Sequence, residues 1–204
     1  TLARAGLSPL VAERGYDVEA RHAAIERFWQ RGTLDVRSNV QFGEGGAGTF
    51  SDGKLTTRSG DALAREVLDA FVAAGAPAEI RYLHKPHVGT DLLRGIVKNI
   101  REEIRRLGGE IRFLAQVTDI ELKDGVLHAL IVNGEERVQA GTAFFAIGHS
   151  ARDTYEMLLS RGLFLEAKAF AVGVRVEHPQ SFIDRVQYGK DTGNARLPVA
   201  DYSL

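Results

Sequence analysis

Cysteine is the most informative absence in this sequence. None of the 204 residues is Cys, which excludes disulfide bonds, thiolate metal sites and a redox-active dithiol. Any redox chemistry must therefore come from a bound cofactor. Long apolar runs are also missing: no segment approaches the roughly 18 residues of a membrane-spanning helix, and no charged and apolar leader begins the chain. We expect a cytoplasmic protein with no membrane span.

Neither positive nor negative charge is in clear excess. The chain carries 26 Lys and Arg against 27 Asp and Glu, a formal net charge of −1. This balance gives no electrostatic reason to bind nucleic acid or an anionic membrane. The six histidines form no cluster with acids at metal-ligand spacing, so we predict no metal site. Nothing in the composition specifies an oligomeric state.

Glycine, in contrast, is concentrated in one place. Residues 42–55 read FGEGGAGTFSDGKL and contain five glycines, which allow positive φ and a close approach of the main chain to a ligand. Thr49, Ser51, Asp52 and Lys54 add hydroxyl, carboxylate and ammonium groups, which suit phosphate or the polar edge of a ring. Apolar residues bracket the segment, which argues against a freely solvated surface loop. We predict a ligand-binding loop.

Two familiar phosphate motifs overlay this loop. Residues 43–48 satisfy G-x-G-x-x-G, and residues 48–54 satisfy the glycine and lysine spacing of a P-loop, but Leu55 occupies the position of the magnesium-binding hydroxyl. Both motifs also need a strand directly before and a helix directly after, and residues 49–60 show no apolar helical period. We interpret both overlays as chance matches, and a P-loop phosphotransferase is kept only as a third alternative.

The periodicity of the rest of the chain predicts an α/β protein. Helices are expected over residues 18–32 with Asp17 as N-cap, 63–75, 90–108, 151–160 and 179–186. Strands are expected over residues 9–13, 111–113, 117–122, 126–132, 137–139, 142–147 and 170–177. Residues 110–141 thus form an antiparallel meander that returns into a buried parallel strand. The basic residues Arg101, Arg105 and Arg106 are expected on a solvated helix face.

An acid follows the first expected strand. Glu13 stands at the carboxyl end of a short apolar segment, where a dinucleotide-binding fold places the carboxylate that binds an adenosine ribose. The matching glycine fingerprint should lie about 20 residues earlier, upstream of Thr1. We therefore expect a fragment that lacks the first strand and the fingerprint.

The expected strand over residues 142–147 ends at a second candidate contact. Ligands in open α/β sheets gather at the carboxyl ends of strands, so Gly148 is predicted to touch a cofactor. Ser150 is expected to cap the following helix, with Asp153 in its first turn. His149 either donates to a cofactor carbonyl or is an ordinary loop residue.

Three motifs resemble a family of bacterial FAD-dependent oxidoreductases of the glutathione-reductase-like FAD fold. They are VQFGEGGAGTFSDGKLTT at residues 40–57, KPHVGTD at 85–91 and AIGHSARDTY at 146–155. The resemblance implies a Rossmann-like three-layer fold with the meander inserted. It also implies that Glu13 binds the FAD ribose, that residues 45–51 lie beside the flavin or pyrophosphate, and that the strand at Val117 supports the adenine end. Lys54 and Asp52 either face the flavin or pair with each other or with Glu44.

The residues thereby assigned to the cofactor are Glu13, Arg14, Gly43, Gly45, Gly46, Ala47, Gly48, Thr49, Ser51, Asp52, Lys54, Val117, Ala146, Gly148 and His149. Residues 1–165 are expected to form a partial FAD-binding domain, and residues 166–204 to begin a second, substrate-facing domain. The predicted function is a dehydrogenase-like flavoprotein that acts on an unidentified small molecule, with NAD(P)H as a candidate electron donor. No catalytic residue can be assigned. The alternative is an FAD- or nucleotide-binding module without turnover.

Overall fold

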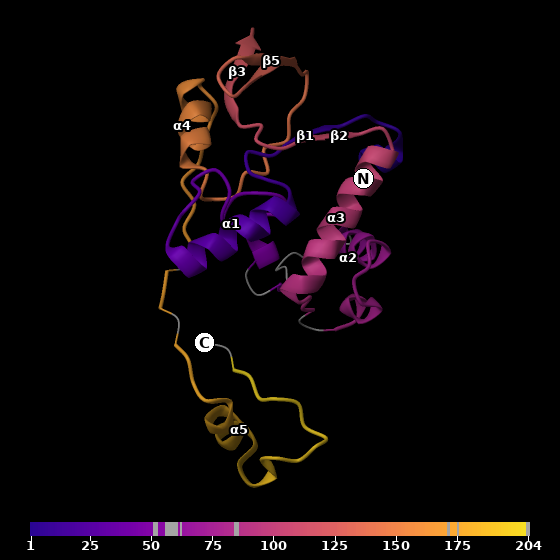
Figure 1. Cartoon of the computed structure of the whole chain (residues 1–204), viewed down its shortest axis with the longest axis vertical. Helices are drawn as coiled ribbons and strands as arrows, with labels where there is room; N and C mark the ends of the chain where they lie inside the picture. The colour runs from indigo at the N-terminus through magenta and orange to yellow at the C-terminus, as the bar shows by residue number, and fades with distance from the viewer. Residues whose placement is uncertain are drawn as a thin grey trace. The chain divides into compact units, whose positions relative to one another are not determined.

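The chain divides into two compact units, Thr1–Phe164 and Leu165–Leu204, which are described separately. The computed structural model describes residues 1–50, 53–55, 61, 63–83, 86–170, 172–174 and 176–202. Helices and small sheets are mixed in the first unit (Figure 1), so the predicted α/β class is confirmed. The roles expected of the two units, cofactor binding and substrate contact, stay predictions.

A short parallel pair begins the first unit. Strand β1 (Leu10–Ala12) lies beside β2 (Glu110–Arg112), with Leu10 opposite Glu110. Parallel neighbours need a long crossover connection, and the chain between them forms helices α1 (Val18–Arg31), α2 (Leu63–Ala73) and α3 (Thr90–Arg106). The assignment of residues 111–113 to the antiparallel meander is therefore wrong, because β2 takes its partner from the start of the chain.

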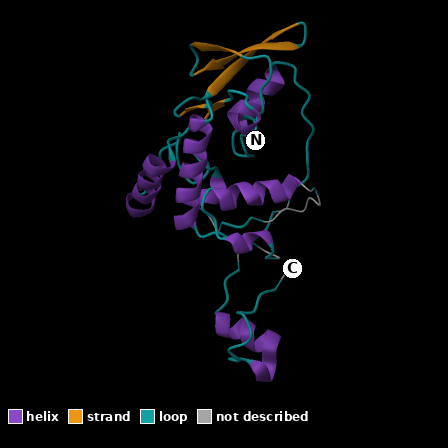
Figure 2. Ribbon diagram, turned by 90° about the vertical axis from the view of Figure 1, so that its right-hand side faces the viewer, coloured by secondary structure: helices purple, strands orange, loops and turns teal. Residues whose placement is uncertain are grey.

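The predicted meander is confirmed for its other three strands. Strands β3 (Val117–Lys123), β4 (Val126–Val132) and β5 (Glu136–Gln139) form an antiparallel sheet in that order. The β3–β4 turn has φ of 52° at Asp124 and 76° at Gly125, the two positive values that a type I′ hairpin requires. Figure 2 shows both sheets, in orange, at the same end of the first unit.

The predicted strand over residues 142–147 does not form. This segment has no regular secondary structure, and Phe144 is 80% exposed. The same holds for the described part of residues 170–177, where Val174 is 89% exposed. An apolar run becomes a strand only where a neighbour accepts its backbone hydrogen bonds, and no described strand pairs with either segment.

The helices follow the apolar pattern of the sequence. They are α1 (Val18–Arg31), α2 (Leu63–Ala73), α3 (Thr90–Arg106) and α4 (Arg152–Ser160), with single 3₁₀ turns at Ala3–Ala5, Ala47–Phe50 and Ala78–Arg81. As predicted, the Asp17 carboxylate caps α1 by accepting from the Ala20 amide at 2.8 Å. Within the described residues, no helix has the length and apolar character that crossing a bilayer demands.

The main apolar cluster lies between α2, α3 and the 3₁₀ turn Ala78–Arg81. Its buried members include Ile80, Val88 and Ile96, and Phe71 of α2 packs against them. The backbone of Gly53 joins this cluster, because its carbonyl accepts from the Val88 amide at 3.0 Å. The chain that follows the glycine-rich loop is thus fixed to the core.

The second unit is built around helix α5 (Gln180–Tyr188), close to the predicted residues 179–186. One carboxylate joins this helix to the end of the described chain. Asp184 Oδ1 accepts from Gln180 Nε2 at 2.8 Å and from the Ala200 amide at 2.9 Å. The chain after α5 therefore returns to the side of the helix.

Truncation of Ile96 should test the core. We expect Ile96→Ala to lower the free energy of unfolding by about 2–5 kcal/mol, because a fully buried side chain leaves a cavity. Leu92→Ala removes an exposed side chain from the same helix and is the matched control. Denaturant unfolding measures both, and equal losses in the two variants would contradict the assigned core.

Candidate functional site

The glycine-rich loop is wrapped around a buried arginine. Arg21 of α1 is fully buried, and its Nη1 donates to the carbonyls of Gly43 at 3.1 Å, Glu44 at 2.6 Å and Gly46 at 2.9 Å. Its Nε donates to the Asn39 carbonyl at 2.9 Å. The loop therefore turns its carbonyl oxygens inward, toward a cation.

Two glycines are required by this packing. A Cβ on Gly43, where φ is 118°, would lie 2.4 Å from Arg21 Cδ, and a Cβ on Gly45, where φ is 85°, would lie 2.2 Å from Thr49 Oγ1. Both positions combine a left-handed backbone with no space for a side chain. The phenyl ring of Phe50 closes the other side, with its centroid 4.7 Å from Arg21 Cζ.

The loop also crosses the segment that follows β1. Glu13 Oε1 accepts from the Gly15 amide at 2.8 Å and from the Gly43 amide at 3.1 Å. A Cβ on Gly15 would lie 2.5 Å from the Gly43 Cα, so the two backbones touch. Glu13 thus anchors the loop to the carboxyl end of β1, and a carboxylate has acceptor capacity beyond these two bonds.

Arg14 links the same strand end to helix α4. Its Nη2 lies 2.6 Å from Asp153 Oδ2 and its Nη1 lies 3.1 Å from Oδ1, a bidentate pair that favours planar recognition. The guanidinium stacks over Phe42 at 4.5 Å from the ring centroid. Gln116 also donates to Asp153, and the Arg14 ion pair is the main cause that lowers the pKa of Asp153.

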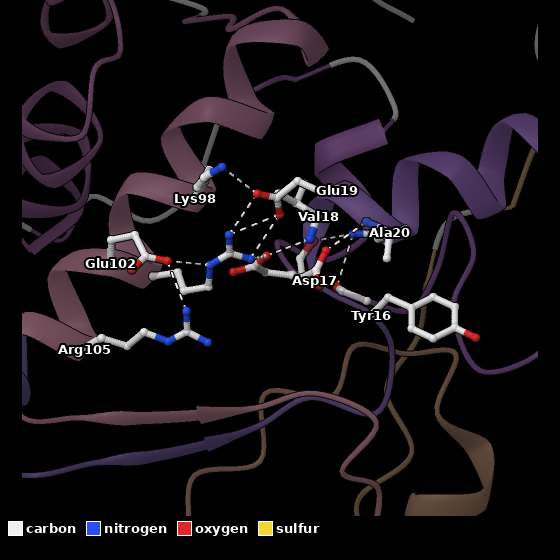
Figure 3. Close-up of polar contacts among 12 residues, drawn as sticks. Tyr16, Asp17, Val18, Glu19, Ala20, Lys98, Glu102 and Arg105 are labelled. Atoms are coloured by element: carbon white, nitrogen blue, oxygen red, sulfur yellow. Dashed lines mark hydrogen bonds and ion pairs between the residues drawn. The ribbon is translucent and has the colours of Figure 1, made fainter.

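A second buried arginine connects the loop to helix α3. Arg101 Nη1 donates to Glu44 Oε2 at 2.8 Å, and its Nη2 donates to Glu19 Oε1 at 3.0 Å. Figure 3 shows Glu19 facing Lys98 of α3, whose Nζ lies 2.8 Å from Oε1. The prediction of a solvated Arg101 is wrong: it is 6% exposed, because Glu44 and Glu19 reach it from outside its own helix.

Burial shifts the pKa of two charged groups at the loop, the Arg21 guanidinium and the Glu44 carboxylate. It lowers the pKa of Arg21 to about 10, against the opposing charges of Glu13 and Glu44, so the guanidinium stays charged at neutral pH. Burial likewise raises the pKa of Glu44, although the Val18 amide and Arg101 favour its charged form. Among the described residues, the Nη2 of Arg21, the Nε of Arg14 and the Nδ1 of His22 are buried without a hydrogen-bond partner.

The outer face of the loop, residues 45–48, consists of three glycines and one alanine. Residues 45–48 are exposed, and a Cβ on Gly46 or Gly48 would have no heavy atom of the described residues within 4 Å. Gly48 has an ordinary φ, whereas Gly46 has a φ of 71°. This face offers backbone to a ligand at the carboxyl end of β1, above a buried positive charge.

The structure brings part of the predicted site together. Glu13 accepts from the Gly43 amide and Arg14 stacks over Phe42, at the start of the loop that continues through Gly45, Gly46, Ala47, Gly48 and Thr49. Val117 begins β3 opposite Val132. Ala146, Gly148 and His149 lie on the segment before α4, which Ser150 connects to Gln41 by a 3.2 Å hydrogen bond. Ser51 and Asp52 lie outside the described residues.

Two predicted local roles need correction. Ala151, and not Ser150, is the N-cap of α4, and no side chain caps this helix; the Ser150 hydroxyl instead reaches Gln41. The Glu44 carboxylate, one predicted partner of Lys54, is held by Arg101 and the Val18 amide. Lys54 itself forms an isolated antiparallel bridge with His87.

The two buried arginines were missed by reasoning from motifs alone. Their positions carry a signal, because Arg21 falls between Val18 and Ile25 on the apolar stripe of α1. Arg101 falls between Val97 and Ile104 in the same way on α3. A cation on an apolar stripe at helical spacing predicts a buried charge that must find acceptors.

The chain is similar to known proteins in two ways, through a family match over its last residues and through a relative over its whole length. Residues 169–204 match the family described as FAD-dependent protein, C-terminal domain-like. Over its 204 residues the chain is 56% identical to a protein of Clostridium beijerinckii (strain ATCC 51743 / NCIMB 8052) named "Uncharacterized protein". The chain spans 38% of the length of that relative. The family match and the glycine-rich loop lie in different units.

Acid should weaken the link between α1 and α3. The hydrogen bond from Arg101, followed by that from Lys98, lowers the pKa of Glu19 from 4.5 to about 2. Because the folded-state pKa is the lower one, this stabilisation is complete above pH 4.5 and is lost as the pH falls toward 2. In Glu19→Gln the free energy of unfolding should therefore fall less between neutral and acid pH than in the wild type. The difference should be modest, because Glu19 is half exposed.

Denaturant unfolding at neutral pH and at about pH 3 measures this effect. Glu66→Gln, which changes an exposed carboxyl on α2, is the control. An unchanged difference between the two pH values in Glu19→Gln would contradict the assignment.

Proposed function

We propose that this chain is part of an FAD-dependent oxidoreductase. The observation that carries the proposal is the match of residues 169–204 to an FAD-dependent family. The glycine-rich loop, held at the carboxyl end of β1, supports it from the other unit. We further propose the glutathione-reductase-like dinucleotide fold for the first unit, because a carboxylate directly follows a strand that has a parallel neighbour.

The residues of the loop fit an anionic cofactor. FAD carries a diphosphate, and the exposed main chain of residues 45–48 lies over the buried charge of Arg21. The open Cβ positions of Gly46 and Gly48 leave room for close approach. In the proposal these residues hold the diphosphate or the flavin edge, and Glu13 holds ribose hydroxyls while its Oε1 anchors the loop.

Bound FAD would supply hydride or electron transfer, chemistry that the side chains of a Cys-free chain do not provide. Arg14 and Asp153 hold the start of α4 beside β1, which positions the segment of Gly148 and His149. We propose that residues 166–204, which lie within the second unit, face the substrate.

A binding module without turnover is the alternative function. It would use the same loop and the same Glu13, so reduction of the cofactor distinguishes the two. A P-loop phosphotransferase is disfavoured by local geometry, because Lys54 lies in an antiparallel bridge with His87. A P-loop lysine stands instead where the loop enters a helix.

The deciding measurement is the absorption spectrum of the full-length protein, followed by anaerobic addition of NADH or NADPH. We expect the bands of an oxidised flavin, which bleach on addition of a donor and return with oxygen. Flavin bands that no donor bleaches would favour the binding module. A protein that remains colourless after FAD is supplied would overturn the cofactor assignment.

Gly48→Ala should separate cofactor binding from folding. The added methyl group meets no heavy atom of the described residues within 4 Å, and Gly48 has an ordinary φ, so we expect unchanged or slightly higher stability. If the loop lies against FAD, the methyl group intrudes between them and weakens the affinity by about tenfold or more. Titration of the apoprotein with FAD, followed by flavin fluorescence, measures the change.

Gly95→Ala is the matched control, because Gly95 is also exposed with an open Cβ position, on α3. It should bind FAD like the wild type. Equal FAD affinity in the wild type, Gly48→Ala and Gly95→Ala would show that the outer face of the loop does not contact the cofactor.

A further inference from the structure

The contacts of Arg21 fix the direction of the peptide units in the loop. In a trans peptide the carbonyl and the N–H of the next residue point in opposite directions. The carbonyls of Gly43, Glu44 and Gly46 point at the guanidinium. The amides of Glu44, Gly45 and Ala47 must therefore point away from it.

The three amides differ in their hydrogen-bond partners. The Glu44 amide donates to the Tyr16 carbonyl at 3.0 Å, which ties the loop to the segment after β1. No described residue accepts from the amides of Gly45 and Ala47, and both residues are exposed. Arg21 thus leaves the amides of Gly45 and Ala47 directed outward, and outward backbone N–H groups can donate to an anion.

Only an arginine can make this arrangement. Nε reaches the Asn39 carbonyl while Nη1 reaches the three loop carbonyls, which needs donors spread over a rigid planar fork. A lysine carries the same charge on a single nitrogen, and it cannot span both sets of acceptors. Shape, as well as charge, is therefore required at this position.

We infer that Arg21 is a positioning residue, which holds the glycine-rich loop with the amides of Gly45 and Ala47 directed at the diphosphate of the cofactor. This inference rests on the proposed function. Arg21 is buried beneath the loop and acts through the backbone that it orients. Its charge also favours an anion on the opposite face of the loop.

Arg21→Lys tests the inference in the full-length protein. We expect faster hydrogen–deuterium exchange in apoprotein peptides that cover residues 43–50, with unchanged exchange in peptides of α3. We also expect the dissociation constant for FAD to rise by about tenfold or more. Arg27→Lys, an exposed position on the same helix, should change neither quantity.

Each result has a separate meaning. FAD affinity within about twofold of the wild type, despite a loosened loop, would overturn the positioning role. Weaker FAD binding with unchanged loop exchange would overturn it too. If the wild type binds no FAD, the proposed function fails and the role toward the diphosphate fails with it, while faster exchange in Arg21→Lys would still establish the clamp.

The wild-type protein decides the question if Arg21→Lys does not fold. FAD should then slow exchange in peptides that cover residues 43–50, because its diphosphate accepts from the outward amides. Loop exchange that is the same with and without bound FAD would overturn the inference.

Discussion

Burial of the positive charge of Arg21 is the constraint on which the site depends. A buried guanidinium is tolerated only where acceptors surround it, and the backbone carbonyls of Asn39, Gly43, Glu44 and Gly46 supply them. The loop must therefore bend around the helix that carries Arg21. The bend requires a positive φ at Gly43, where any side chain would collide with the arginine itself.

The glycines of the loop consequently serve two purposes. Gly43 and Gly45 are required by packing, because a Cβ at either position would overlap a side chain that the fold needs. Gly48 has an ordinary φ and open space around its Cβ position, so folding alone would accept alanine there. A glycine that folding does not require is consistent with a neighbour outside the chain. The fold thus accounts for Gly43 and Gly45, and the positive φ of Gly46 favours glycine there as well, whereas Gly48 is not required by the described contacts.

Local signals in the sequence were sufficient where local interactions decide the structure. The cap at Asp17 and the Asp124–Gly125 turn follow from neighbouring residues, and α/β class followed from periodicity. Partners distant in sequence could not be read in this way. The strand expected over residues 142–147 found no described neighbour, β2 paired with β1, and Arg101 was buried by Glu44 from another element. The loop was located from glycine density, but the arginine that shapes it was not.

Glu44 is the point at which these separate constraints meet. Its amide donates to Tyr16, its carbonyl accepts from Arg21, and its carboxylate accepts from Arg101 and the Val18 amide. One loop residue is therefore fixed to the end of β1, to α1 and to α3. The amide, the carbonyl and the carboxylate of Glu44 each have different partners, so none of the three groups can replace another. The loop is thereby held from three sides, with its outer face, residues 45–48, exposed beside this anchor.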